Sequence, residues 1–455
     1  MGVKMNFLGD VLDILSSKIL YPAYCKFKKD NQLNYVSEVE EFNKLSCDKI
    51  SEFKIQKIRF IVEYAYKNTI YYNSLFKSIG LKDFSNLTLE DLKQIPVLTK
   101  DIIREEGDNL LSKRYSKKNM RKTATGGTTA SPVPFYSDFE SMYRKRSATI
   151  AFDKWCGYSP GLRSVYLWQA RQDLVELKGI KQRLLNALVF KNYFFPGSPL
   201  DDSIMEKYYN KIKKISPVLL QAYPTPLEIF ANFLLKNNYK LKINSITTTA
   251  EPLLDNQISL IEKVFNTKPI NWYGAREAGR IATECRERKG MHINEYCLHL
   301  EIDKNNFTEE NFGSILITDL WNIGMPLIRY EIGDIGVISN KNCDCGCNLT
   351  RLMNIYGRVN DTFVNSKKQK IPGVWFPNQF LINCDEIKEM QIVQFGIQEF
   401  KLLVVKGDRF SESTEGWVKA KLNEFMHEDN SIEIIYVANI PKEKSGKTRF
   451  CKNIM

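Results

Sequence analysis

Three short stretches of this chain carry residue types that could handle a nucleotide. Residues 123–132 form a loop rich in glycines and hydroxyl side chains, a composition that lets the backbone approach phosphate oxygens closely. Residues 272–277 place aromatic rings beside Glu277, whose carboxylate suits a hard metal ion. Residues 441–447 end on Lys447, a cation near the C-terminus. A phosphate cradle, a purine platform and a mobile cation together predict the activation of a carboxylate by ATP.

The segments between these stretches must bring them together in space. From residue 213 to residue 273, strand-like apolar runs alternate with helical ones. This alternation predicts a largely parallel sheet with ligand loops at its carboxyl edge. Residues 138–155 have the pattern of a long helix, and residues 296–340 are richer in strand patterns. Thr88 and Thr99 each precede an acidic first turn and are predicted to cap helices.

The pattern changes near residues 357–361, after which shorter strand and helix patterns follow, including a helix predicted over residues 377–383. About a hundred residues are enough for a small domain. We therefore predict an α/β (α+β) fold of two domains. Residues 1–357 form a large N-terminal domain of mixed sheets and helices, and residues 358–455 form a small, mobile α+β C-terminal domain.

The N-terminal residues 1–24 are amphipathic. Asp10, Asp13 and Lys18 interrupt any apolar core of a signal peptide. No apolar run in the chain reaches the roughly 18–20 residues that span a bilayer. We expect a helix that packs its apolar face on the body of the protein. A helix that lies on a membrane surface is the alternative, so membrane contact is at most peripheral.

The net charge of +12 favours anionic partners. Basic clusters at residues 113–122 and 144–146 are either solvated faces or attract polyanions such as ATP, coenzyme A or anionic lipid headgroups. Nucleic acid is not an expected partner, because these runs lack interleaved stacking aromatics and no nucleic-acid module is visible. The ten cysteines, with no secretion signal, predict reduced thiols and a cytoplasmic location.

On these motifs the chain resembles the adenylate-forming ligases, the acyl-CoA synthetase superfamily. Within it, the phenylacetate–CoA ligase group and its capsular-polysaccharide relatives of the CapK type are the nearest match. The resemblance runs in collinear order from about residue 50 to the end. It implies an AMP-forming acid–thiol ligase that uses ATP and Mg²⁺ to make an acyl-adenylate from a small carboxylate and transfers the acyl group to coenzyme A. Two alternatives stay open: transfer to a carrier protein or sugar amine in surface-polysaccharide synthesis, and a catalytically weak scaffold of the same fold.

The resemblance also implies roles for individual residues. Tyr273 would stack on adenine, Asp334 would accept hydrogen bonds from both ribose hydroxyls, and Glu277 would hold Mg²⁺. The implied catalytic residues are Glu277, Arg358, which would contact phosphate or ribose, and Lys447, which would swing in to the carboxylate and α-phosphate. The implied nucleotide-binding residues are Thr125, Gly126, Gly127, Thr128, Thr129, Ala250, Glu251, Trp272, Tyr273, Gly274, Asp334 and Arg358.

Two of the motifs depart from the family's pattern, one at Ala130-Ser131 and one at Asn360. Ala130 and Ser131 stand where a Gly-Lys pair is common, and the missing lysine is expected to weaken the grip on ATP. Asn360 stands where the family's hinge has a carboxylate. Asparagine tolerates unusual backbone angles, so bending is expected to survive, whereas a hinge salt bridge would be lost.

Cysteines and one histidine near the second motif suggest a metal site. Cys285, His292, Cys343 and Cys345 form a candidate tetrahedral set for a structural Zn²⁺, and the phenylacetate–CoA ligase group has similar segments. The alternative is a group of free reduced thiols, since Cys-x-Cys spacing is less diagnostic than Cys-x-x-Cys. The nearby Cys297 or Cys347 could replace one of the ligands.

Overall fold

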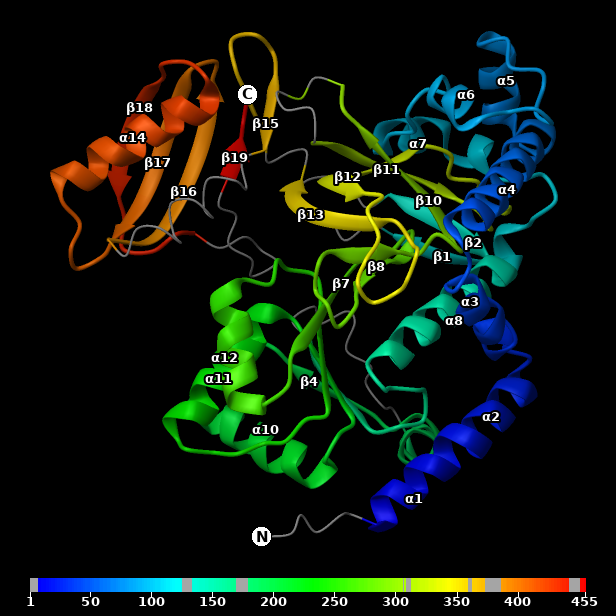
Figure 1. The fold of residues 1–455 in the computed structure, drawn as a ribbon, viewed down its shortest axis with the longest axis horizontal. Helices are drawn as coiled ribbons and strands as arrows, with labels where there is room; N and C mark the ends of the chain where they lie inside the picture. The colour runs from blue at the N-terminus through cyan, green and yellow to red at the C-terminus, as the bar shows by residue number, and fades with distance from the viewer. Residues whose placement is uncertain are drawn as a thin grey trace.

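The structure is a computed structural model, and it describes residues 7–124, 133–168, 179–305, 307, 312–358, 362–372, 386–441 and 451–455 (Figure 1). Residues 125–129, Ala130, Ser131, Asn360, the predicted helix over residues 377–383 and Lys447 lie outside the described residues. For Arg358 the structure gives the backbone only.

One eleven-stranded sheet runs through the body of the protein in the order β10-β11-β12-β13-β9-β8-β7-β6-β5-β3-β4. From β7 to β4 all neighbours are parallel, and from β7 to β10 all are antiparallel. The strand direction therefore changes at β7, which carries the second sequence motif. The strands are β3 (Ser164–Trp168), β4 (Asn192–Pro196), β5 (Leu219–Ala222), β6 (Ser245–Thr248), β7 (Pro269–Ala275), β8 (Gly279–Glu284), β9 (Met291–Ile293), β10 (Leu298–Asp303), β11 (Gly313–Asp319), β12 (Tyr330–Ser339) and β13 (Arg351–Arg358). A separate hairpin pairs β1 (Met120–Ala124) with β2 (Pro134–Asp138).

Helices cover each half of this sheet. Three helices, α10, α11 and α12, supply buried side chains to the core of the parallel half, and they lie together at the lower left of Figure 1. The long helices α4 and α8 contribute to the core of the antiparallel half. The helices of the N-terminal part are α1 (Phe7–Leu15), η1 (Ser16–Leu20), α2 (Tyr21–Lys28), η2 (Asn31–Leu33), α3 (Val36–Phe42), α4 (Cys47–Asn68), α5 (Ile70–Ser78), α6 (Leu89–Lys93), α7 (Lys100–Glu106), η3 (Gly107–Leu110), η4 (Lys117–Asn119), α8 (Phe139–Trp155), α9 (Ile180–Leu185), η6 (Asn186–Phe190), α10 (Asp202–Ile215), α11 (Pro224–Lys236) and α12 (Asp255–Phe265).

Local sequence explains where several helices begin and which face they bury. Thr88 and Thr99 accept hydrogen bonds from the amides of Asp91 and Ile102, which confirms both predicted N-caps. The predicted parallel sheet is confirmed as well, since β5, β6 and β7 alternate with α11 and α12. The mixed α/β class predicted from the sequence is therefore correct.

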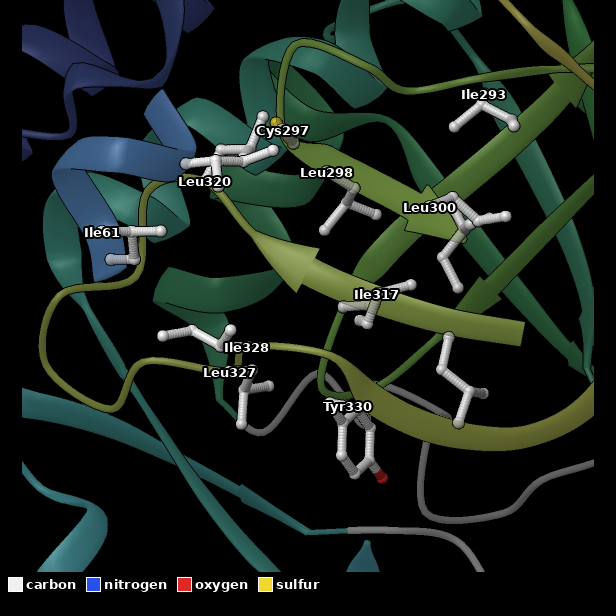
Figure 2. Close-up of a cluster of buried hydrophobic side chains, with 14 of the residues drawn as sticks. Ile61, Ile293, Cys297, Leu298, Leu300, Ile317, Leu320, Leu327, Ile328 and Tyr330 are labelled. Atoms are coloured by element: carbon white, nitrogen blue, oxygen red, sulfur yellow. The ribbon is translucent and has the colours of Figure 1, made fainter. Parts of the chain in front are cut away.

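The core of the antiparallel half is drawn in Figure 2. Leu298 and Leu300 from β10 and Ile317 from β11 lie in one cluster with Ile61 of α4 and with Leu327 and Ile328 just before β12. Tyr330, the first residue of β12, borders the same cluster and is fully buried. The core therefore packs around the ring of Tyr330 from several sides, and the hydroxyl group needs a polar hydrogen-bond partner.

The C-terminal residues form a smaller unit with its own core, drawn in orange and red in Figure 1. Its four-stranded sheet has the order β18-β17-β16-β19, and α14 contributes Val418, Leu422 and Met426 to the core beside it. A hairpin of β14 and β15 precedes this sheet. The division at residue 358 and the mobility of the unit stay predictions. The elements are β14 (Thr362–Val364), β15 (Lys370–Pro372), β16 (Ile387–Gly396), β17 (Glu399–Lys406), α14 (Glu412–Met426), β18 (Ser431–Tyr436) and β19 (Cys451–Asn453).

The N-terminal helices differ from the prediction. They do pack on the body, but Asp13 and Ser16 are buried while Val11, Ile14 and Ile19 are exposed. The expected apolar contact face is therefore wrong for α1 and η1, because their buried side chains, Asp13 and Ser16, are polar. None of the helices in the described ranges has the length and hydropathy that crossing a membrane requires.

Candidate active site

The side chains of Tyr273 and Asp334 meet although their strands, β7 and β12, are not neighbours in the sheet. The hydroxyl of Tyr273 on β7 donates to Oδ2 of Asp334 on β12 at 2.5 Å. In the sheet order, three strands stand between β7 and β12. In a flat sheet the two strands would be about 19 Å apart, at roughly 4.8 Å for each step. The antiparallel half must therefore curve strongly. This curvature brings Tyr273, predicted to stack on adenine, beside Asp334, predicted to bind the ribose.

Glu277 lies in the turn between β7 and β8, and its side chain is buried. Tyr330 donates its hydroxyl hydrogen to Oε1 of Glu277 at 3.0 Å. Burial, together with the neighbouring charge of Glu277, raises the pKa of Tyr330, so its hydroxyl stays a donor. Among the described residues, the carboxylate of Glu277 has no ion-pair partner. A buried carboxylate without a nearby cation is costly unless something else binds it.

Lys145 of α8 contacts the backbone of the turn that carries Glu277. Its Nζ donates to the backbone oxygen of Glu277 at 3.3 Å and forms an ion pair with Oδ2 of Asp319 at 2.5 Å. Asp319 is fully buried at the end of β11. The backbone of Glu277 is therefore tied to a buried ion pair, which limits how far the turn can move.

The basic run 144–146 is consequently not a free surface. All three side chains form ion pairs within the protein, so the interpretation as a solvated or anion-binding face is wrong for this run. The pairs are Arg144–Glu140 (2.9 Å), Lys145–Asp319 (2.5 Å) and Arg146–Asp30 (3.4 Å).

The residues beside Tyr273 are held by close packing. The guanidinium of Arg280 lies 4.6 Å from the ring centroid of Trp272 and forms an ion pair with Asp153 at 2.7 Å. At Gly274 a Cβ atom would lie 2.6 Å from the backbone oxygen of Gly279, so only glycine fits this bulge between β7 and β8. These contacts fix the direction in which Tyr273 leaves the strand.

Two further predicted site residues, Ala250 and Glu251, lie in the segment after β6. Ala250 has a φ of 70°, which is unusual for a residue with a Cβ atom. Glu251 accepts a hydrogen bond from the backbone amide of Thr225 at 3.0 Å, in the first turn of α11. A carboxylate at a helix N-terminus is stabilised by the helix dipole. The contacts of these residues with a nucleotide stay predictions.

The backbone of Arg358 is the remaining described part of the predicted site. Arg358 on β13 is the register partner of Asp334 on β12. It therefore lies next to the predicted ribose acid, although the contacts of its side chain stay a prediction. The predicted roles of Thr125, Gly126, Gly127, Thr128, Thr129 and Lys447 fall on residues outside the described ones.

The four predicted metal ligands come together at one place. The ligand atoms of Cys285, His292, Cys343 and Cys345 all lie within 4.8 Å of one another. The two sulfur atoms of Cys285 and Cys343 are 3.7 Å apart, and Sγ of Cys345 is 3.3 Å from Nε2 of His292. The predicted replacements are not members of this cluster, because Cys347 contacts the backbone oxygen of Asn43 and Cys297 lies in the core.

The surroundings of the cluster suit a metal. Nδ1 of His292 is 3.4 Å from the backbone oxygen of Leu349, which leaves Nε2 facing the thiols. Burial lowers the pKa of His292, so the imidazole is neutral, the form that binds metals. The cluster joins the turn after β8 to the loop between β12 and β13, next to the short pairing of His292 with Arg351. A metal there would cross-link two hairpins of the curved sheet.

Comparisons with known proteins relate this chain to CapK and to CoA ligases. A family model described as the CapK C-terminal domain matches residues 363–454. Protein CapK of Staphylococcus aureus is 26% identical over 431 residues, which are 92% of each chain. Phenylacetate-coenzyme A ligase of Thermus thermophilus is 24% identical over 339 residues, covering 71% of this chain and 74% of that protein. Among solved structures, 2-hydroxyisobutyryl-CoA ligase in its postadenylation state with 2-HIB-AMP has a TM-score of 0.67 at 17% identity, over 90% of each chain.

The chain has the fold of the adenylate-forming CoA ligases. The resemblance predicted from the motifs is thereby confirmed, including the relation to both CapK and phenylacetate–CoA ligase. The match to the ligase fold covers 90% of the chain.

Sequence reasoning missed the residues that support the site. The motifs predict no role for Tyr330, and Lys145 belongs to the basic cluster of residues 144–146. Asp319 ends an apolar strand, and its burial depends on the pairing of β10 with β11. A sequence signal existed only for Tyr330, since it directly precedes the acidic stretch that carries Asp334.

Proposed function

We propose that this protein is an AMP-forming acid–thiol ligase that activates a small carboxylate with ATP. In the first step a carboxylate oxygen attacks the α-phosphorus of ATP, which gives an acyl-adenylate and pyrophosphate. In the second step the thiol of coenzyme A attacks the acyl carbon and AMP leaves. The aromatic–carboxylate pair Tyr273–Asp334, next to the buried acid Glu277, is the observation that carries this proposal.

The described residues suit Mg²⁺ at Glu277. The carboxylate is buried, receives one hydrogen bond from Tyr330, and has no cation partner among the described residues. Mg²⁺ prefers carboxylate oxygens and keeps further positions for phosphate oxygens and water. Bound there, the ion would neutralise charge on the phosphates. The task of Glu277 is therefore to hold one oxygen ligand at a fixed place, which its ties to Tyr330 and Lys145 maintain.

The remaining parts of the site act on the nucleotide and the reacting oxygens. Tyr273 would offer its ring to the adenine, and Asp334 would accept hydrogen bonds from the ribose. Lys447 would bring its ammonium to the carboxylate and α-phosphate, where negative charge gathers. We propose that the C-terminal unit then turns near Asn360 so that the same site serves the second step.

The acyl acceptor distinguishes two versions of this proposal. The match to the CapK C-terminal domain and to CapK favours transfer to a carrier protein or a sugar amine as the second candidate. Once an accepted acid is known, AMP release should be measured with and without coenzyme A. Rapid AMP release and a thioester only with coenzyme A support the ligase. Adenylate formation without any response to coenzyme A supports the second candidate.

A scaffold without catalysis is the weakest alternative. Ala130-Ser131 and Asn360 depart from the family's motifs, which motivates it. However, the two acids predicted for the active site are each held by a hydrogen bond from a tyrosine. Tyr273 donates to Asp334, and Tyr330 donates to Glu277. We further propose a cytoplasmic location, which suits thiols that stay reduced. Every described cysteine is free of disulfide bonds.

Tyr330→Phe is expected to lower the adenylation rate roughly tenfold, because a hydrogen bond to a charged group contributes about 1.5–3 kcal/mol. The loss should depend on Mg²⁺ concentration, since Glu277 would hold the ion less firmly. The measurement is the rate of pyrophosphate release over a Mg²⁺ titration. Tyr72→Phe is the matched control, because Tyr72 is equally buried but donates to the backbone oxygen of Pro326. An equal change in Mg²⁺ dependence in both variants would remove Tyr330 from the site.

We also propose that Cys285, His292, Cys343 and Cys345 bind a structural zinc ion. Elemental analysis of the purified protein should give about one zinc per chain, and His292→Gln should lose most of it. His299→Gln is the control, because His299 is also buried but lies outside the cluster. A zinc content well below one per chain in the parent protein, after growth with added zinc, would discard the site.

A further inference from the structure

The N-terminal helices α1 and η1 present their apolar side to the outside. Ile14 is 60% exposed and Ile19 is 58% exposed, whereas Asp13 and Ser16 between them are buried. A surface helix normally buries its apolar face and exposes its polar one. This orientation is inverted, so the exposed apolar face has no partner within the described protein.

The inversion is fixed by specific polar contacts. Asp13 accepts hydrogen bonds from Nε of Arg163 at 2.9 Å and from Nζ of Lys191 at 3.0 Å. These three side chains are all buried, so rotating the helix would separate a buried ion-pair network. Breaking such a network costs several kcal/mol. The helix therefore cannot simply turn its apolar face inward.

A second helix extends the same surface. Ile180, Leu184 and Leu188 are exposed at four-residue intervals along α9 and η6, and Ile180 is 78% exposed. η1 packs against η6, and Ser16 donates its hydroxyl hydrogen to the backbone oxygen of Leu188. On η6 the polar residue Asn186 and the apolar residue Val189 are buried, whereas Leu188 is exposed. A shallow hollow of about 410 Å³ runs along this apolar side.

Among the described residues of α1, η1, α9 and η6, the charged side chains without an ion-pair partner are all basic. The acidic residues of α1 are used internally, since Asp10 and Asp13 pair with Arg163 at 2.8 and 2.9 Å. Lys18, Lys181 and Arg183 are exposed on the same segments and have no ion-pair partner among the described residues. An apolar face bordered by free cations is the composition of helices that bind anionic membranes.

We propose that the face formed by α1, η1, α9 and η6 docks the protein on the surface of an anionic lipid bilayer. The exposed isoleucine and leucine side chains enter the headgroup region, and Lys18, Lys181 and Arg183 contact lipid phosphates. A second copy of the chain is a poor occupant, because a two-fold contact would bring these cations against each other. Figure 1 shows α1 at the end of the molecule opposite the hairpin of β14 and β15, so docking leaves the C-terminal unit facing away from the lipid. This proposal does not depend on the proposed reaction.

The test is co-sedimentation of the full chain with vesicles of phosphatidylcholine alone or with about one-third phosphatidylglycerol. The expected result is binding to the anionic vesicles that weakens with salt and is much lower on neutral ones. The double variant Ile14→Glu, Leu184→Glu should bind at least about tenfold more weakly, because two apolar anchors are lost and two negative charges are added. Lys18→Glu with Lys181→Glu should weaken binding to anionic vesicles only.

The control is Ile397→Glu, since Ile397 is 50% exposed in the turn between β16 and β17, outside this face. It should bind as the parent protein does. All variants change exposed residues, and melting curves establish that they are folded. The proposal is overturned if the parent does not bind anionic vesicles or if the double variant binds equally well. It is also overturned if light scattering shows a dimer that the double variant dissociates, which would assign the face to a second copy.

Discussion

Lys447→Ala is expected to lower the rate of adenylation by roughly two orders of magnitude or more, as the loss of a charge-stabilising group does. The ammonium would neutralise the charge that builds up between the attacking carboxylate and the α-phosphate. It contributes little before that charge develops, so the affinity for ATP should change little. Pyrophosphate release in single turnovers measures the rate, and equilibrium titration with ATP measures the affinity.

Lys444→Ala is the matched control, because it removes the same side chain three positions earlier in the same segment. It should keep the parent rate. Equal adenylation rates in Lys447→Ala and the parent protein would remove Lys447 from the mechanism. A large loss of ATP affinity with an unchanged rate of chemistry would show a binding role instead.

Glu277→Gln is expected to lower adenylation roughly 100-fold, because it removes the charge that would hold Mg²⁺ beside the phosphates. The amide keeps the size of the side chain and an oxygen that can accept from Tyr330. The folded protein should be as stable as the parent or more stable, since a buried carboxylate without a cation partner among the described residues is costly. Pyrophosphate release over a Mg²⁺ titration and a thermal melt without Mg²⁺ check both expectations.

Glu301→Gln provides the comparison. Glu301 is also poorly accessible, but it pairs with Arg329 at 3.2 Å. This variant should lose stability and keep its Mg²⁺ dependence, the reverse of Glu277→Gln. If Glu277→Gln melts well below the parent and retains its activity, Glu277 is a structural residue and the proposed metal position is wrong.

The sequence predicted the elements whose residues are near one another along the chain. The N-caps Thr88 and Thr99 and the alternating strands and helices up to β7 follow from local patterns. The gathering of Cys285, His292, Cys343 and Cys345 could also be predicted, because these residue types are the usual zinc ligands and stand close to two turns. The resemblance to a known family implied that Tyr273 and Asp334 both contact the nucleotide, but their hydrogen bond to each other was not predicted.

The rest depended on contacts between distant segments. Lys145 in a basic run has the pattern of a solvated side chain, and only the packing of α8 against β8 and β2 brings it to the buried Asp319. The orientation of α1 is decided by Arg163 and Lys191, which lie far along the chain and draw Asp13 inward. Hydrophobic periodicity predicts that such a helix has two faces, but not which of them faces the protein.

Carboxylate-dependent exchange between pyrophosphate and ATP shows whether this protein forms an acyl-adenylate. The assay should cover aryl, alkyl, hydroxy and amino acids in the presence of Mg²⁺. We expect exchange with at least one class of acid, lost in Lys447→Ala and retained in Lys444→Ala. No exchange with any acid, from folded protein shown to bind ATP, would contradict the proposed adenylation.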